Sequence, residues 1–194
     1  MDYASTYWIV SLADVKTALS VDDTEDDEII GQILSRVSEE FNEYTGRTLL
    51  ASDLTEYYNG DGTTLLYLDS YPVNSTTSTM EVYVDDDNDF DADSKLASTQ
   101  FWIETKVGAV KRLGDNFPAG IRNIKVVYNA GYAAGSMPEP LRGAAFDMCR
   151  QYYMARDERP DVNSISKGDT SRSFIDGRFP PGVRAILDDY KRYS

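Results

Sequence analysis

Residues 124–158 read IKVVYNAGYAAGSMPEPLRGAAFDMCRQYYMARDE, and this stretch decides how the rest of the chain is interpreted. A β-rich run from Ile124 to Tyr128 ends in a glycine-containing turn, and Pro138 and Pro140 then precede an apolar helix. Proline suits the first turn of a helix, because the N–H groups there have no intrahelical partner. The order strand, turn, helix predicts a β-rich region that leads directly into a core helix.

This helix carries two apolar stripes, which predicts that it is covered on two sides. The first stripe contains Leu141, Ala145, Met148, Tyr152 and Ala155, and the second contains Phe146, Cys149 and Tyr153. We expect one stripe to pack against a helix from the N-terminal part of the chain. The other stripe is expected to face further helices or a neighbouring subunit, with Phe146 and Tyr153 as the candidate interface residues.

Length and charge restrict the class of protein. The chain has 194 residues and 41% apolar content, which fits one domain with a core, and its net charge is −14. Residues 1–137 hold 9 Lys/Arg and 24 Asp/Glu, whereas residues 138–194 hold 10 and 9. The acidic surface therefore belongs to the first two thirds. Such a charge argues against generic nucleic-acid binding through phosphate neutralisation.

Few residues of the chain are suited to catalysis. The sequence has no histidine, which removes Ser-His-Asp and Cys-His catalysis and the commonest zinc ligand. Its single cysteine, Cys149, lies in the apolar helix and is expected to be a buried thiol. P-loop, GxGxxG and GxSxG motifs are absent. We therefore expect no enzyme, no catalytic residue, no cofactor and no metal site, although carboxylate-based chemistry stays open.

No hydrophobic targeting or spanning segment is visible. The N-terminal residues include Asp2 and no basic run, and no stretch of about 18 apolar residues occurs. We expect a soluble protein that is made inside the cell and has no membrane partner.

Two helices are predicted before residue 50. Ser11 caps a short one that presents Leu12, Val15 and Leu19 on one face, with Asp14 in the capping-box position. A longer helix is expected from Thr24 to Thr45, ended by Gly46. The acidic run of residues 22–28 is better explained by the favourable charge at a helix N-terminus than by a cation site.

From Leu54 onward the sequence period changes to that of strands. Thr55–Tyr58 and Leu65–Leu68 are expected to pair as a hairpin across the turn of residues 59–62. Met80–Val84 is a further strand, Phe101–Thr105 and Val107–Leu113 form a second predicted hairpin, and Ile121–Tyr128 is the last strand. Tyr71-Pro72-Val73 is expected to be a turn or a strand edge.

Six aspartates crowd into residues 85–93 between two of these strands. Asp85, Asp87 and Asp89 match positions 1, 3 and 5 of a calcium-binding loop. However, Phe90 replaces the glycine of position 6, and Leu96 replaces the glutamate of position 12. Mutual repulsion then favours a solvated hairpin tip. Adventitious binding of a divalent cation and a true calcium site are the alternatives.

The C-terminal part reads as a loop followed by a helix. Residues 160–173 are polar and are expected to be a mobile loop. Phe174, Ile175 and Phe179 look exposed, and Val183, Ile186, Leu187 and Tyr190 define a last amphipathic helix. This helix is expected either to fold back on the core or to dock on a partner.

These elements predict an α+β fold. It is mainly a bundle of about four helices, with a β-rich insertion of about five to six strands between the second and third helix. We expect one domain over residues 1–194: N-terminal helices in 1–52, the β-rich insertion in 53–133, and the core helix with the C-terminal loop and helix in 134–194.

Several segments taken together resemble the head–tail connector (adaptor) proteins of long-tailed bacteriophages and prophages. The second helix closes in Tyr44-Thr-Gly-Arg47, and Tyr71-Pro72-Val73 lies in the β-rich middle. The most distinctive part is Val127-Tyr-Asn-Ala-Gly-Tyr132 followed by Pro138-Glu-Pro-Leu141, and the helix then ends in Tyr152-Tyr-Met-Ala-Arg156. The acidic run of residues 85–93 and the length of the β region depart from the family pattern.

The resemblance implies a structural assembly protein. Family members form a ring, usually dodecameric, beneath the portal protein, where they extend the DNA channel and dock a head-completion (stopper) or tail protein. DNA passes without sequence-specific binding, and free subunits are expected to be monomers. The resemblance places the protein at the head–tail interface of the virion, after assembly in the host cytoplasm.

Portal binding in the family relies largely on the C-terminal segment. By position this implies Phe174, Ile175, Phe179, Val183, Ile186, Leu187 and Tyr190 as portal-binding residues. The alternatives are a tail-completion or other neck protein and, less favoured, a cation-binding or carboxylate-based hydrolytic enzyme.

Overall fold

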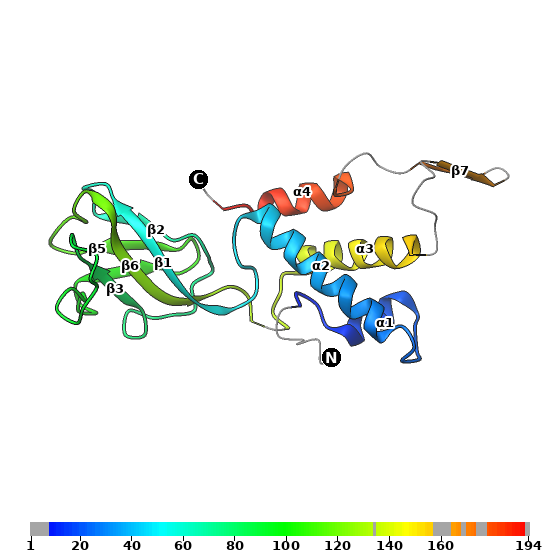
Figure 1. Cartoon of the computed structure of the whole chain (residues 1–194), viewed down its shortest axis with the longest axis horizontal. Coiled ribbons are helices and arrows are strands. Elements are labelled where there is room, and N and C mark those ends of the chain that lie inside the picture. Colours follow the sequence, from blue (N-terminus) through cyan, green and yellow to red (C-terminus); the bar gives the residue numbers. More distant parts are fainter. Residues whose placement is uncertain (1–7, 134, 157–163, 168–169, 174–177, 193–194) are drawn as a thin grey trace. The chain divides into compact units, whose positions relative to one another are not determined.

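The structure is a computed structural model that describes residues 8–133, 135–156, 164–167, 170–173 and 178–192 (Figure 1). The chain divides into two compact units. We call Met1–Thr45 with Met137–Lys191 the helical unit, and Gly46–Ser136 with Arg192–Ser194 the β unit. The β unit is thus inserted between the second and third helix of the helical unit, as the sequence predicts.

The helical unit contains four helices and one short hairpin in its described residues. The helices are α1 (Leu12–Leu19), α2 (Asp27–Thr45), α3 (Glu139–Ala155) and α4 (Pro181–Asp189). The hairpin pairs β7 (Ser164–Lys167) with β8 (Thr170–Ser173) in the segment that was predicted to be a loop. Polar composition alone therefore did not reveal this pairing.

The helix ends follow local hydrogen bonding. The Asp14 N–H donates to Ser11 Oγ at 3.1 Å, which confirms the predicted cap of α1. The predicted start of α2 at Thr24 is wrong, because the Glu25 N–H bonds to Asp23 Oδ1 and the Asp27 N–H bonds to the Thr24 carbonyl in a turn before the helix. The predicted end is confirmed by Gly46, whose φ of +70° is left-handed.

Helix α2 is the centre of the helical unit, where it packs against α1, α3 and α4. Its buried residues recur at three- and four-residue steps, as on one face of a helix. Fully or almost fully buried residues of the unit include Ile30, Leu34, Val37 and Phe41 from α2, Leu141, Ala145 and Met148 from α3, and Val183 and Leu187 from α4. The core of this unit therefore already includes the C-terminal helix.

The β unit contains two antiparallel three-stranded sheets. One sheet has the order β1-β6-β3, with β1 at Ser52–Gly60, β6 at Gly120–Ala130 and β3 at Glu81–Val84. The other has the order β2-β5-β4, with β2 at Leu65–Tyr67, β5 at Ala109–Arg112 and β4 at Phe101–Glu104. Both sheets contribute to one buried cluster, which includes Leu66, Phe101, Val110, Val82, Ile124 and Val126.

The pairing of β1 corrects one prediction. β1 pairs with β6, as in Leu54 opposite Tyr128, and not with β2. β2 pairs instead with β5, where Leu66 lies opposite Val110. The long strands β1 and β6 cover each other over almost their full length, whereas the three-residue β2 offers little to pair with. The predicted second hairpin, β4 with β5, is confirmed.

The turn after β6 explains one glycine of the quoted motif. Gly131 has φ +110°, and a Cβ at this position would lie 2.4 Å from the Leu50 carbonyl group. Only glycine combines this backbone conformation with such a close approach of another chain segment. The neighbouring Tyr132 N–H donates to the Leu49 carbonyl at 2.7 Å, so the motif fastens the two connections at this end of the β unit.

The acidic run between β3 and β4 is a solvent-exposed tip, as predicted. The Val84 N–H donates to the Ser94 carbonyl at 2.9 Å and the Leu96 N–H to the Val82 carbonyl at 2.8 Å, so residues 94–96 return along β3. Asp86, Asp87 and Asp89 are exposed. Within the described ranges no group of three or more His, Cys, Asp or Glu residues is placed to hold a metal ion.

The α+β class and the insertion of the strands between α2 and α3 are confirmed. Among the helices that the structure describes, none has the length and apolar character needed to cross a membrane.

Candidate functional site

The C-terminal helix α4 carries most of the residues that the sequence assigned to portal binding. Val183 and Leu187 are buried, with 3% and 0% of their surface exposed, whereas Ile186 and Tyr190 are half-buried. Phe174 and Ile175 lie outside the described residues. The helix therefore folds back on the core through one face, and the other face stays accessible.

Phe179 differs from its expected exposure. Only 7% of its surface is accessible, and its ring packs edge-on against Phe41 at 5.9 Å and against Tyr44 at 5.1 Å. Edge-on aromatic pairs of this kind add to the free energy of burial. Exposure was expected because Gly177, Pro180 and Pro181 are neighbours of Phe179 in the sequence. These neighbours do not reveal that aromatic residues of α2 cover the ring.

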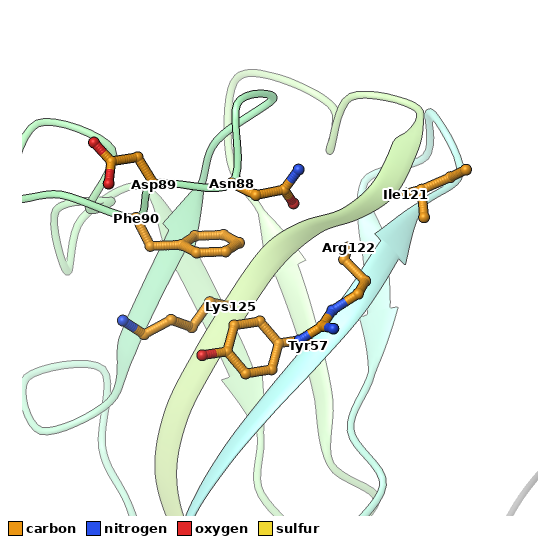
Figure 2. A pocket seen from close by; sticks show the side chains of 7 residues that line it. All are labelled: Tyr57, Asn88, Asp89, Phe90, Ile121, Arg122 and Lys125. Atoms are coloured by element: carbon orange, nitrogen blue, oxygen red, sulfur yellow. The ribbon is translucent and has the colours of Figure 1, made fainter.

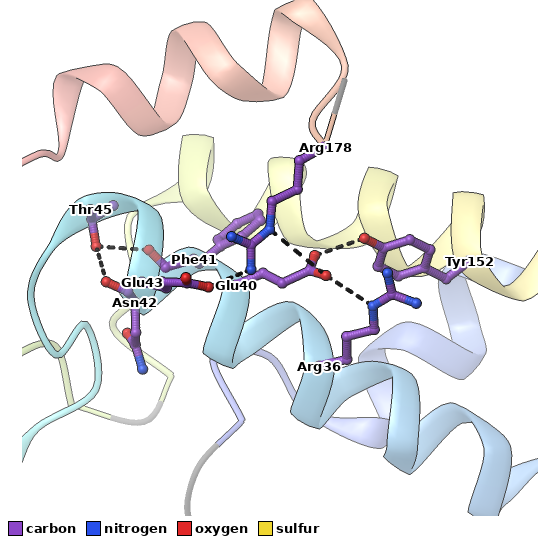
Figure 3. Close-up of polar contacts among 8 residues, drawn as sticks. All are labelled: Arg36, Glu40, Phe41, Asn42, Glu43, Thr45, Tyr152 and Arg178. Atoms are coloured by element: carbon purple, nitrogen blue, oxygen red, sulfur yellow. Dashed lines mark hydrogen bonds and ion pairs between the residues drawn. The ribbon is translucent and has the colours of Figure 1, made fainter. Parts of the chain in front are cut away.

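A polar network around Glu40 joins α2, α3 and the segment before α4 (Figure 3). Glu40 accepts hydrogen bonds from Arg36 Nε at 2.9 Å and from Tyr152 Oη at 2.7 Å. Arg178 Nε lies 4.0 Å from the same carboxylate, and Arg178 also donates to Glu43 at 2.6 Å. The Glu40 side chain is only 10% exposed, so its charge is compensated where water is largely excluded.

This network shifts the ionisation of its members. Burial, followed by the hydrogen bond to Glu40, raises the pKa of Tyr152 to about 12, which keeps its hydroxyl a donor at neutral pH. The Arg178 hydrogen bond lowers the pKa of Glu43. The Arg36 guanidinium also lies over the Tyr152 ring at 4.0 Å. The arrangement holds α2, α3 and the residues just before α4 together.

A second contact fixes the end of α4. Tyr44 Oη donates to Asp188 Oδ1 at 2.7 Å, and Arg184 Nε donates to Tyr44 Oη at 3.2 Å. Lys191, followed by Tyr44, lowers the pKa of the Asp188 carboxyl by hydrogen bonding. These contacts lie at the surface and set the position of the helix more than they add to stability.

The two residues expected at a subunit interface lie in different surroundings. Phe146 is half-buried, with the Arg142 guanidinium 5.8 Å from its ring. Tyr153 is 9% exposed, donates to Asp26, and carries the Arg156 guanidinium 3.7 Å from its ring. Tyr153 therefore has an evident role within the helical unit, whereas Phe146 stays partly accessible.

A shallow groove of about 380 Å³ runs between α2 and α3 in the helical unit. Its lining is apolar at Ile29, Ile33 and Ala155 and is flanked by Arg36 and Arg156. Both arginines are paired, with Glu40 and Asp26 respectively. The sequence did not single out this groove.

An open pocket in the β unit has a volume of about 620 Å³ (Figure 2). It is lined by Tyr57 from β1, by Asn88, Asp89 and Phe90 from the acidic tip, and by Ile121, Arg122 and Lys125 from β6. The Tyr57 and Phe90 rings lie 5.6 Å apart in a tilted arrangement. Arg122 lies 4.7 Å above the Tyr57 ring, and Lys125 lies 4.4 Å from the Tyr83 ring.

Sequence reasoning missed this pocket. In the sequence, Phe90 stands out only as a mismatch in a calcium-loop pattern, and Ile121 and Lys125 only as strand residues. The available signal was local: Asn59-Gly60 and Gly120 to Asn123 place glycine and asparagine inside strands, which is typical of a bulge. The pairing of β1 with β6 places the segment Asn59-Gly60 next to the segment from Gly120 to Asn123.

The single thiol is free and buried in the helical unit. Cys149 is 1% exposed, and burial raises its pKa to about 12, so it stays protonated at neutral pH.

Comparison with known proteins gives a consistent assignment. The family model described as head completion protein matches residues 8–193. Comparison with curated proteins found no match.

Solved structures with the same fold cover the whole chain. A chain from the virion of the native gene transfer agent (GTA) particle has a TM-score of 0.66 at 16% identity, and the match covers 100% of this chain and 93% of that one. A chain from the neck of the empty GTA particle, computed with C6 symmetry, gives 0.63 at 18%, covering 100% and 94%. One from the native neck, computed with C12 symmetry, gives 0.64 at 16%, covering 100% and 93%. Since the family model spans nearly all of the sequence, the chain belongs to the head completion protein family.

Proposed function

We propose that this protein is a structural head–tail adaptor whose subunits form a ring under the portal of a phage-like particle. The ring extends the DNA channel and presents a surface on which the next head-completion (stopper) or tail protein docks. The observation that carries the proposal is the family match over residues 8–193. Similarity of the whole fold to chains in the neck of GTA particles, solved with C6 and C12 symmetry, supports it.

The helical unit is suited to portal docking through α4. One face of this helix is fastened to the core by Val183 and Leu187, and the Glu40 network holds the segment that precedes it. Ile186 and Tyr190 remain half-exposed on the helix. The docking residues are therefore Ile186 and Tyr190 together with Phe174 and Ile175 upstream, while Phe179, Val183 and Leu187 support them from the core.

A structural role fits the chemistry of the chain. The protein carries a net charge of −14, so DNA that slides through a channel of such subunits is repelled by the walls and does not adhere to them. No step of this function needs a catalytic group. Assembly takes place in the host cytoplasm and the finished ring resides at the head–tail interface of the virion.

Co-sedimentation with purified portal protein tests the proposal. The full-length chain is expected to sediment with the portal, and Ile186→Asp and Phe174→Asp are expected to weaken this binding about ten-fold or more. Ala18→Asp, which introduces the same negative charge at an exposed position of α1, is the control and is expected to bind normally. Circular dichroism verifies that each variant is folded.

Two results would contradict the proposal. One is a full-length chain that does not sediment with the portal, and the other is unchanged binding of both docking variants. Electron microscopy of the particle distinguishes the alternative, a tail-completion protein, because its density would lie beyond the stopper and not next to the portal.

A further inference from the structure

The strand pairing between β1 and β6 contains a bulge at one end. Tyr58 lies opposite Ile124 and Gly60 lies opposite Gly120, so the single residue Asn59 faces the three residues 121–123. A bulge adds residues to one strand and turns their side chains in new directions, and such bulges are common next to binding sites. Figure 2 shows that the two side chains diverge here: Ile121 points away from the other lining residues, and Arg122 points toward the Tyr57 ring.

Hydrogen bonds and close backbone packing hold the bulge in place. Asn123 is 1% exposed, accepts a hydrogen bond from the Gly60 N–H at 2.9 Å, and donates to the Pro118 carbonyl at 2.9 Å. The Arg122 N–H donates to Asn59 Oδ1 at 2.8 Å. A Cβ on Gly60 would lie 1.8 Å from the Pro118 carbonyl oxygen, so the backbone is packed as closely as glycine allows. The protruding residues therefore have a fixed position.

Strained backbone gathers at the same place. Asn88, Phe90 and Arg122 have φ angles of +62°, +53° and +53°, and all three line the pocket. Only one further non-glycine residue in the described ranges, Ser20, has a positive φ. Strain of this kind persists where the surrounding structure imposes it, and it is frequent at binding sites. Ile121, at 81% exposure, is the most exposed large apolar residue that the structure describes.

The charge of this surface is opposite to that of the chain. Arg122 and Lys125 form no ion pair with any residue in the described ranges. Three of the six carboxylates in the nearby acidic tip accept hydrogen bonds within the chain. Asp85 and Asp91 accept backbone N–H groups of their own loop, and Asp86 accepts from Asn123, which leaves Asp89 as the carboxylate in the lining.

We infer that this bulge surface, formed by Tyr57, Phe90, Ile121, Arg122 and Lys125, binds a carboxylate-rich surface of a second copy of this chain. A second copy is the expected occupant because its surface is acidic and complements the two cations of the bulge surface. Residues 1–137 of every copy hold 24 Asp/Glu against 9 Lys/Arg. A closed ring needs two different patches that complement each other, and a small cationic surface on an acidic subunit supplies one of them. The inference rests on the proposed ring.

A nucleic acid is a poorer occupant although arginine and aromatic side chains are present. The loop of residues 85–93 contributes Asn88, Asp89 and Phe90 to the rim and carries six aspartates in all, so a continuous phosphate chain bound here would be repelled by it. A protein surface presents individual carboxylates and an apolar recess for Ile121, and it can avoid that rim.

Charge reversal tests the inference in the assembled system of full-length chain and portal. Ile121→Asp and Lys125→Glu are expected to lower the yield of complete rings on the portal at least ten-fold, as counted by native mass spectrometry and electron microscopy. Ile121 is 81% exposed, so its replacement leaves the fold intact. Lys111→Glu, an exposed lysine of β5 with the same charge change, is the matched control and is expected to assemble normally. Normal ring yield in both bulge variants would overturn the inference.

Cross-linking identifies the occupant directly. Ile121→Cys is labelled with a photoreactive maleimide, and the buried Cys149 is shielded from the reagent. After irradiation of portal-bound rings, mass spectrometry is expected to find cross-links to acidic peptides of another copy. Cross-links only to DNA or to a different protein, or no cross-link between copies, would overturn the inference. Failure of the proposed function is distinguishable, because then the unaltered chain does not bind the portal at all.

Discussion

Two glutamates show how differently the two units use charge. In the helical unit, Glu40 is compensated by Arg36 and Arg178 and accepts a hydrogen bond from Tyr152. In the β unit, Glu56 accepts hydrogen bonds from the tyrosines Tyr58 and Tyr128, the latter at 2.5 Å, and it forms no ion pair with any described residue. The helical unit neutralises its carboxylate with cations, whereas the β unit binds its carboxylate with hydroxyl groups.

The difference follows from what each unit must join. Arg178, which precedes α4, reaches Glu40 and Glu43 on α2, and a cation on a long side chain can span such a distance. In the β unit the strands are already fixed by backbone hydrogen bonds, so Glu56 needs only short donors. Two cations of the β unit, Arg122 and Lys125, lie at the pocket and form no ion pair with a described residue, so they are available to a partner.

The largest expected effect on stability comes from truncating the side chain that anchors α4 to the core of the helical unit. Leu187 is fully buried, so Leu187→Ala leaves a cavity and is expected to cost about 3 kcal/mol. The chain has two tryptophans, one in each unit, and Trp8 donates to Ser35 Oγ in the helical unit. Urea unfolding followed by Trp8 fluorescence in a Trp102→Phe background measures the loss. Ile186→Ala, at a half-buried site, is the control, and an equal effect of both would contradict the assignment of the buried face.

Gly60→Ala tests the rigidity of the bulge in the β unit. The added Cβ would lie 1.8 Å from the Pro118 carbonyl oxygen, which is backbone and cannot rotate away. We expect a loss of about 2 kcal/mol from overpacking. Trp102 fluorescence in a Trp8→Phe background reports on this unit. Unchanged stability would show that the bulge yields easily and does not hold Ile121 and Arg122 in place.

Part of this arrangement was predictable from the sequence, and the reason is physical. Helix α3 and its proline start were predicted because helical spacing and turn residues are local properties. The pairing of β1 with β6 was not, because it joins residues about seventy positions apart and no local pattern records a partner. Burial of Phe179 and exposure of Ile121 were missed for the same reason, because each depends on whether an element distant in the sequence packs against that side chain.

The Glu40→Gln and Glu56→Gln pair sharpens the comparison of the two carboxylates. We expect Glu40→Gln to cost about 2 kcal/mol, because two arginines lose their hydrogen-bonded or nearby anion. The arginine side chains are 61% and 45% exposed and are therefore screened by salt. We expect 1 M NaCl to reduce the difference in unfolding free energy between Glu40→Gln and the unaltered protein. Glu56→Gln is expected to show no such salt dependence. Urea titrations at low and high salt measure both, and equal salt responses would contradict the difference.

Alkaline pH probes the Glu40 network through Tyr152. Its folded-state pKa is raised to about 12 from an ordinary value of 10, so its contribution to stability is fully present below pH 10 and is lost as the pH rises towards 12. Ultraviolet absorbance at 295 nm, compared with Tyr152→Phe, measures the ionisation. In Glu40→Gln the titration is expected to move to lower pH, because a hydrogen-bonded carboxylate is lost. An unchanged titration in Glu40→Gln would show that the Glu40 carboxylate does not raise the pKa of Tyr152.

The smallest expected effect concerns the surface of α3. Gly143 is exposed in the middle of this helix, and a Cβ there meets no atom within 4 Å. Alanine restricts the unfolded backbone more than glycine does, so Gly143→Ala is expected to stabilise the helical unit by about 0.5–1 kcal/mol. The Trp8 unfolding transition measures this gain. Because the change adds only one methyl group next to Phe146, reduced ring assembly by a stabilised Gly143→Ala variant would locate a subunit contact on this face of α3.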